Sequence, residues 1–211
     1  MKFTLTYDGQ LPSTGNSSKK VEEKWAIRNQ ISPQLKELWI THPALLRATR
    51  YRVMPKSTNV QFLDAHHSII EPPVRSAAVS ENQIDLCASI KRGNVNFHPL
   101  VRETFALACS LKILFMRKEA VGRVYQGGDL DNRIKTLLDA LSIPTPEQVM
   151  NVPETDMYCL LEDDSLVTGL SVETRRLLSR PGYPENEVRL IIDVDVRITD
   201  TRIYNTFFLG D

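Results

Sequence analysis

Acidic side chains gather at two places in the C-terminal half of the chain, with types and spacing that could do chemistry. Asp129 and Asp131 flank Leu130 at the beginning of an expected helix. A second group, Glu162-Asp163-Asp164, follows an apolar segment that ends at Leu161. Carboxylates at the end of an apolar strand repel one another and lose hydration unless a cation neutralises them. Because Mg²⁺ prefers oxygen ligands of this kind, the two groups together predict a metal site.

A metal bound by these carboxylates would suit phosphodiester hydrolysis. One or two such ions can activate a water and stabilise the leaving oxygen. Lys135, one helical turn after Asp131, could orient a phosphate or stabilise the pentacoordinate transition state. A simpler interpretation is that Asp129 and Asp131 favour the helix dipole by about 0.3–1 kcal/mol, and that Asp131 pairs with Lys135. That interpretation does not explain the second acidic group, although acidic clusters also form ordinary solvated faces.

Periodic hydrophobic patterns predict the elements that would position these residues. Residues 130–141 are expected to form a helix, because Leu130, Ile134, Leu137 and Leu141 make one apolar stripe and Asp129 is placed to cap it. Alternation predicts strands over residues 2–7, 83–90, 106–115, 158–161, 166–173 and 187–198.

The N-terminal part is expected to contain a long helix. Residues 19–41 predict this helix, and Pro33 is expected to break or restart it. Residues 42–46 are compatible with a further helical stretch, because Pro43 suits a first turn. The order of elements predicts one α/β domain of the mixed α+β kind, in which a small mixed or antiparallel sheet packs against helices.

Two segments fit this plan less regularly. Residues 45–100 are expected to contain an insertion, because prolines interrupt residues 50–82 and no period is sustained there. The apolar residues 203–209 are expected to dock either on the core or on a second subunit.

Composition excludes several classes of protein. The chain has 211 residues, of which 42% are hydrophobic and 25% charged, so wholesale disorder and collagen-like structure are excluded. No apolar run approaches the roughly 18 residues of a membrane span, and residues 1–5 do not resemble a signal peptide. We therefore expect a cytoplasmic protein without a membrane partner. Cys87, Cys109 and Cys159 are odd in number and form no CxxC pair, which predicts reduced thiols.

Net charge is zero, which at first argues against a nucleic-acid partner. The zero is a cancellation, however, because residues 1–60 carry a net +6, residues 61–127 a net +2 and residues 128–211 a net −8. Lys20, Lys24 and Arg28 are spaced i, i+4 and i+8, so they make one face of the expected helix basic. This face predicts a DNA-binding surface, although an ordinary solvated helix face explains the spacing equally well. A second candidate surface consists of Arg117, Lys118 and Arg123.

The two acidic groups also carry a resemblance to a known family. Residues 128–141, GDLDNRIKTLLDAL, followed by LEDDSLV at residues 161–167, closely resemble the signature of RusA-type Holliday-junction resolvases. More loosely, the opening strand with its Pro-Ser-Asn loop, the strand at residues 106–117 and the strand at residues 187–196 resemble the same family. The resemblance covers somewhat more than half of the chain.

The resemblance implies an endonuclease that depends on Mg²⁺, with Mn²⁺ as an expected substitute. It implies a homodimer that cuts branched or structured DNA. The residues that match the family's motif are Asp129, Asp131 and Asp164 as metal-binding carboxylates, Asp163 beside them, Lys135 as catalytic lysine and Asn132 as an orienting residue. This chain is longer and less basic than typical members, so the DNA structure that it cuts stays open.

Two other functions stay in competition. The chain could be a non-catalytic DNA-binding or regulatory protein that keeps the same fold, although the intact acidic set argues against this. Asp129-Leu130-Asp131 could also be the DxD motif of a nucleotide-sugar transferase. That motif normally follows a strand in a nucleotide-binding domain, whereas here it opens an amphipathic helix with no glycine-rich nucleotide loop before it.

Overall fold

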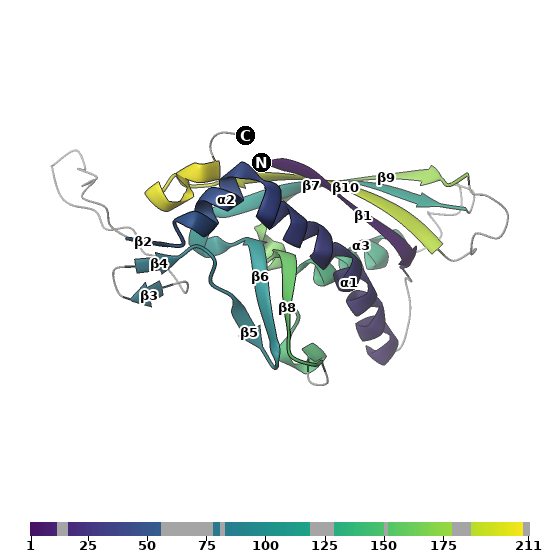
Figure 1. Ribbon diagram of the computed structural model, residues 1–211. Helices are drawn as coiled ribbons and strands as arrows, with labels where there is room; N and C mark the ends of the chain where they lie inside the picture. The colour runs from purple at the N-terminus through teal and green to yellow at the C-terminus, as the bar shows by residue number, and fades with distance from the viewer. Residues whose placement is uncertain are drawn as a thin grey trace.

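The computed structural model describes residues 1–11, 17–55, 78–80, 83–118, 129–149, 152–178 and 187–208. Helices pack against small sheets in these ranges, which confirms the predicted mixed α/β class (Figure 1). None of the helices within the described ranges has the length and apolar character needed to cross a bilayer. The predicted loop at residues 12–16 and much of the predicted insertion, residues 56–77 and 81–82, lie outside the description.

The largest sheet has the strand order β1-β10-β7-β9. Its neighbouring strands β1, β10 and β7 are antiparallel, whereas β9 runs parallel to β7. The inward-facing residues of β7 and β10 are buried and the alternate residues are more exposed, as the sequence alternation predicts. The bounds are β1 (Lys2–Gln10), β7 (Leu107–Arg117), β9 (Val167–Arg176) and β10 (Glu187–Ile198).

A second sheet has the order β5-β6-β8, with β5 (Ile90–Arg92), β6 (Val95–Val101) and β8 (Thr155–Leu161). We did not expect β6, because His98 and Pro99 interrupt its alternation. Its register is nevertheless set by parallel pairing with β8, and its residues Val95, Phe97, Leu100 and Val101 are buried.

A third small sheet has the order β2-β4-β3, with β2 (Val53–Pro55), β3 (Ala78–Ser80) and β4 (Gln83–Asp85). The expected single strand over residues 83–90 is interrupted, because β4 covers its beginning and ends at Asp85, and β5 begins only at Ile90. The side chain of Asp85 accepts a hydrogen bond of 2.8 Å from the N–H of Cys87, and this local bond turns the chain.

The long helix α1 (Ser17–Thr41) runs through Pro33 without a break, so the expected break is wrong. Its buried residues Ile27, Ile31 and Leu35 lie on both sides of the proline and pack into the core. Tertiary packing therefore holds the helix where local propensity would end it.

Two glutamines of α1 bind the backbone of the edge strand β1. The Gln34 amide accepts from the N–H of Thr6 at 2.9 Å and donates to its carbonyl at 2.8 Å. The Gln30 amide makes the same pair of bonds with Asp8, at 3.2 and 2.8 Å. These amides occupy the hydrogen-bonding groups that an edge strand would otherwise leave open.

Two shorter helices complete the set of α-helices in the described ranges. Helix α2 (Pro43–Arg50) begins after His42, whose Nδ1 accepts from the N–H of Ala44 at 3.3 Å, and Pro43 occupies its first turn as expected. Helix α3 (Asp129–Leu141) matches the predicted helix. Short 3₁₀ helices are η1 (Glu103–Phe105), η3 (Pro146–Val149), η4 (Asp164–Leu166) and η5 (Ile203–Phe208).

The C-terminal helix η5 docks on the core, which is one of the two expected positions. Tyr204 is buried and its hydroxyl donates to the carbonyl of Thr104 at 3.3 Å. The ring of Phe207 stacks on that of Tyr51, with centroids 6.1 Å apart.

We expect Gln34→Ala to lower the free energy of unfolding by about 1–2 kcal/mol, because two hydrogen bonds to the edge of β1 are lost. Urea unfolding measures this change, and hydrogen exchange should show faster exchange at Thr6. The control is Glu37→Ala, on an exposed position of the same helix, with an expected change within about 0.5 kcal/mol. Equal effects of the two substitutions would contradict the edge-binding role.

Candidate functional site

Helix α3 presents Asp131, the described carboxylate of the first acidic motif, to solvent. Its stripe of Ile134, Leu137 and Leu141 is buried as predicted, and this fixes which side of the helix faces outward. Asp131, Asn132 and Lys135 are accordingly exposed. Asp129 is the first residue of α3, but its side chain lies outside the description.

The second acidic group follows β8 and is brought to α3. At the end of β8, the carbonyl of Leu161 accepts from the N–H of Ile143 at 3.2 Å, and Ser142 forms a parallel bridge with Leu161. This junction lies at the end of α3 opposite to Asp131. The chain then continues through Glu162 and Asp163 into η4, which contacts α3. The fold thus joins the two elements that carry the motifs.

The described carboxylates do not by themselves form a complete metal site. Among the described residues, no group of three His, Cys, Asp or Glu side chains is arranged to hold a metal ion. Asp131 and Asp164 are both exposed, and the side chain of Asp129 lies outside the residues considered. The predicted sharing of one ion by Asp129, Asp131 and Asp164 therefore stays a prediction.

Two members of the second acidic group have local partners. Asp163 caps η4, because its Oδ1 accepts from the N–H of Ser165 at 2.9 Å. Hydrogen bonds from Ser165 hold the pKa of Asp163 below its usual value. Glu162 accepts from the N–H of Glu103 at 3.2 Å. Asp164, the member of the group that is predicted to bind metal, is the first residue of η4 and is exposed.

The basic face predicted on α1 is turned inward at two of its three positions. Lys24 pairs with Asp139 of α3 at 2.6 Å, and its side chain is 12% exposed. Arg28 is 3% exposed and donates to the carbonyls of Asp139 and Ser142 at 2.7 and 3.5 Å. The expectation of a solvent-facing basic row is wrong for Lys24 and Arg28, because the α1–α3 contact buries them. The side chain of Lys20 lies outside the description.

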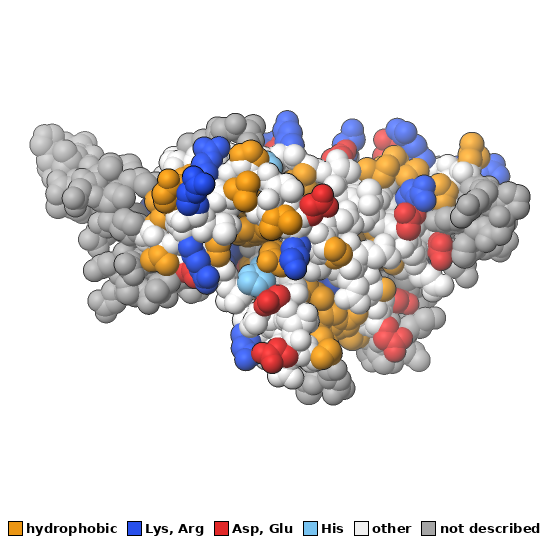
Figure 2. Space-filling view, viewed as in Figure 1, with side chains coloured by type: hydrophobic (Ala, Val, Ile, Leu, Met, Phe, Trp, Pro, Cys, Tyr) orange, Lys and Arg blue, Asp and Glu red, His pale blue; other side chains and the backbone are white. Residues whose placement is uncertain are grey.

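Burial also removes Arg117 from the second predicted basic surface, which consists of Arg117, Lys118 and Arg123. Arg117 is 7% exposed at the end of β7, so it does not form an open lip. Lys118 is half-buried, and Arg123 lies outside the described residues. In Figure 2 the blue Lys and Arg side chains are spread over the visible face, interspersed with red acidic ones, and do not form one patch.

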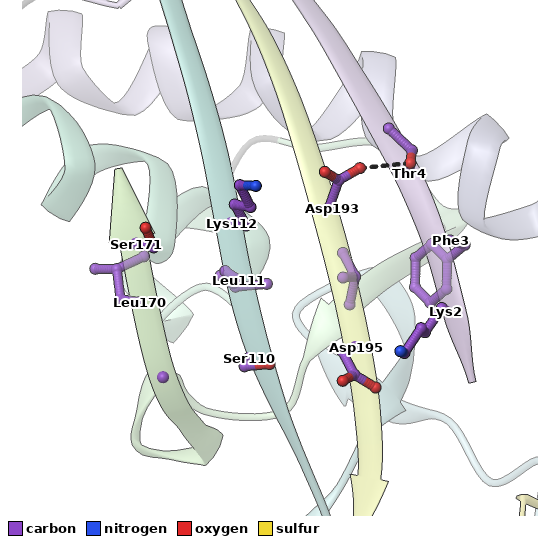
Figure 3. A pocket seen from close by; sticks show the side chains of 12 residues that line it. Lys2, Phe3, Thr4, Ser110, Leu111, Lys112, Leu170, Ser171, Asp193 and Asp195 are labelled. Atoms are coloured by element: carbon purple, nitrogen blue, oxygen red, sulfur yellow. Dashed lines mark hydrogen bonds between the residues drawn. The ribbon is translucent and has the colours of Figure 1, made fainter. Parts of the chain in front are cut away.

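The sheet has a hollow of about 650 Å³ that no sequence pattern predicted. Figure 3 shows its strands, with Asp193 and Asp195 of β10 between β1 and β7. Asp193 accepts from the hydroxyl of Thr4 at 2.7 Å, and Asp195 pairs with Arg197 at 2.7 Å. Both carboxylates therefore already have partners within the protein. The outward alternation of charged residues along β10 is the signal that could have indicated this face.

The cysteines offer no metal site of their own. Cys87, Cys109 and Cys159 are free thiols, as predicted. Burial raises the pKa of Cys159 to about 12 and that of Cys109 to about 12, which keeps both thiols protonated at neutral pH.

Comparison of the chain with protein-family models, with curated proteins and with solved structures gave no match.

A double-mutant cycle tests the structural role of Lys24. We expect Lys24→Met and Asp139→Asn to be coupled by about 1 kcal/mol in the free energy of unfolding, because their ion pair is partly buried. The matched control is the pair Arg175–Glu173, which has the same kind of contact at 2.7 Å but is exposed at both ends. Its coupling should stay below about 0.5 kcal/mol. Equal coupling in both cycles would contradict the buried role.

Proposed function

We propose that the protein is a metal-dependent endonuclease acting on branched or structured DNA. The observation that carries this proposal is the contact between α3 and η4. Helix α3 opens with Asp-Leu-Asp-Asn and η4 opens with Asp164, so both parts of the acidic motif lie on elements that touch. The resemblance of this two-part motif to RusA-type resolvases supports the same proposal.

The chemistry of the donor set fits a hard divalent cation. Asp129, Asp131 and Asp164 would hold Mg²⁺ through carboxylate oxygens, with Asp163 beside them. When bound, the ion would supply an activated water and charge stabilisation for phosphodiester cleavage.

Lys135 and Asn132 lie where they could bind or orient a phosphate. Lys135 is exposed one turn after Asp131, where its ammonium can bind a non-bridging phosphate oxygen and stabilise negative charge in the transition state. Asn132 is exposed next to Asp131 and is proposed to orient a ligand or a water.

DNA contacts require a surface other than the α1–α3 contact. Lys24 and Arg28 are engaged inside the fold, so the proposed contacts are reduced to Lys20, Lys118 and Arg123. A homodimer, as the resemblance implies, would place two such sites on one branched substrate.

The test is cleavage of a four-way junction, a flap and a plain duplex by the purified full chain with Mg²⁺ or Mn²⁺. We expect cleavage of at least one branched DNA. Asp131→Asn and Asp164→Asn should each lower the rate at least about 100-fold, because each removes a metal ligand. Lys135→Ala should lower it by about 10²–10³-fold.

The control variant is Glu154→Gln, which removes an exposed acidic residue outside the motif and should cleave at the wild-type rate. Failure of the folded protein to cut any of these DNAs would refute the proposal. Salt-sensitive DNA binding that Asp131→Asn leaves unchanged, without any cleavage, would favour the non-catalytic DNA-binding protein instead.

A further inference from the structure

A separate cavity of about 300 Å³ lies where α1, α2, β6 and β8 meet. Its wall is largely apolar, and two of its rim residues, Ile40 and Leu46, are 64% and 46% exposed. Figure 2 shows orange hydrophobic side chains over α2 and the adjoining end of α1, with blue basic ones among them. This volume is at the lower end of the range for small-molecule sites. The apolar lining comes from Trp39, Ile40, Leu46, Leu86, Pro99 and Tyr158.

A buried arginine also lines this cavity. Arg102 is 2% exposed, and its guanidinium donates to the carbonyl of Ala88 and lies 4.8 Å from the ring centre of Phe105. Its Nε has no hydrogen-bond partner, and the carboxylates of Glu162 and Asp85 act on the guanidinium electrostatically without a direct hydrogen bond to it. Burial lowers the pKa of Arg102, in keeping with an incompletely compensated charge. Such a charge favours an anion beside it.

The two carboxylates that act electrostatically on Arg102, Glu162 and Asp85, already have other partners, and Glu162 accepts from the N–H of Glu103. Asp85 pairs with Arg52 at 2.9 Å and accepts from the N–H of Cys87. Its carboxylate therefore has partners at the side of the cavity, while Arg102 keeps an unused donor.

The cavity offers a second donor and a flat wall. The indole Nε1 of Trp39 is buried and has no hydrogen-bond partner. The rings of His98 and Tyr158 stack with centroids 4.9 Å apart and an interplanar angle of 22°. A planar apolar body can lie against such a wall while its polar end meets the buried donors.

We propose that this cavity, which we name the Arg102 cavity, binds a small aromatic carboxylate. The carboxylate binds the guanidinium of Arg102, and the ring occupies the apolar space between Trp39 and Tyr158. This site is independent of the acidic residues of α3 and η4, so its test does not depend on the nuclease proposal.

The probe is 2-naphthoate, titrated calorimetrically into the full chain, with its neutral analogue 2-naphthalenemethanol as the matched ligand. We expect saturable binding of the carboxylate and at least tenfold weaker binding of the alcohol, since only the former carries a charge for Arg102. Backbone amide shifts in NMR spectra should gather at residues 86–89 and 98–102. No saturable binding up to about 1 mM overturns the proposal, as does equal affinity for the two ligands.

Two variants and one control locate the site, and Thr49 is chosen because it lines the cavity. Arg102→Met should remove the preference for the carboxylate, and Thr49→Trp, which places a large ring into the cavity, should weaken naphthoate at least tenfold. Should Arg102→Met fail to fold, Thr49→Trp and the two-ligand comparison decide. The control is Arg47→Met, an exposed arginine of α2 that does not line the cavity and should leave affinity unchanged. Wild-type affinity in Thr49→Trp overturns the assignment.

Discussion

The arrangement of the molecule depends on the pairing of two glutamine side chains with an edge strand. Gln30 and Gln34 each give one donor and one acceptor to the backbone of β1, much as a neighbouring strand would. This pairing fixes α1 along the sheet on both sides of Pro33, where the missing N–H would otherwise favour a break. Once α1 is held in this position, its remaining faces determine where α3, α2 and β8 can pack.

Two basic residues of α1, Lys24 and Arg28, then determine the position of α3. Arg28 binds carbonyls at the C-terminal end of α3, where the helix dipole is negative, and its guanidinium lies 5.4 Å from the ring centre of Trp25. Burial lowers the pKa of Arg28 to about 10, and its Nε and Nη1 have no hydrogen-bond partner. The contact is therefore costly in desolvation, and the bond from Lys24 to Asp139 offsets part of that cost. The last turn of the same helix carries Trp39 and Ile40, so α1 links the C-terminal end of α3 to the Arg102 cavity.

Sequence patterns predicted those elements whose burial is regular along the chain. The stripe of α3 and the alternation of β7 and β10 each record a single buried face, and the structure confirms them. The predictions that were wrong or missing share a different cause. The continuity of α1 at Pro33, the pairing of β6 with β8 and the turn after Asp85 depend on contacts with distant segments or on one side-chain bond. Hydrophobic periodicity carries no information about such contacts.

The same distinction separates the two proposed sites. Asp131, Lys135 and Asp164 could be singled out as candidates because their residue types and spacing are visible in the sequence itself. The cavity could not, because its lining brings Arg102 together with Trp39 and Tyr158, which lie on different elements far apart in the sequence. Net charge along the chain has the same limit. Part of the basic excess of residues 1–60 is neutralised within the fold, because Lys24 pairs with Asp139 and Arg52 pairs with Asp85. Counting charge along the chain therefore overstates the basic surface exposed to solvent, because the α1–α3 contact buries part of it.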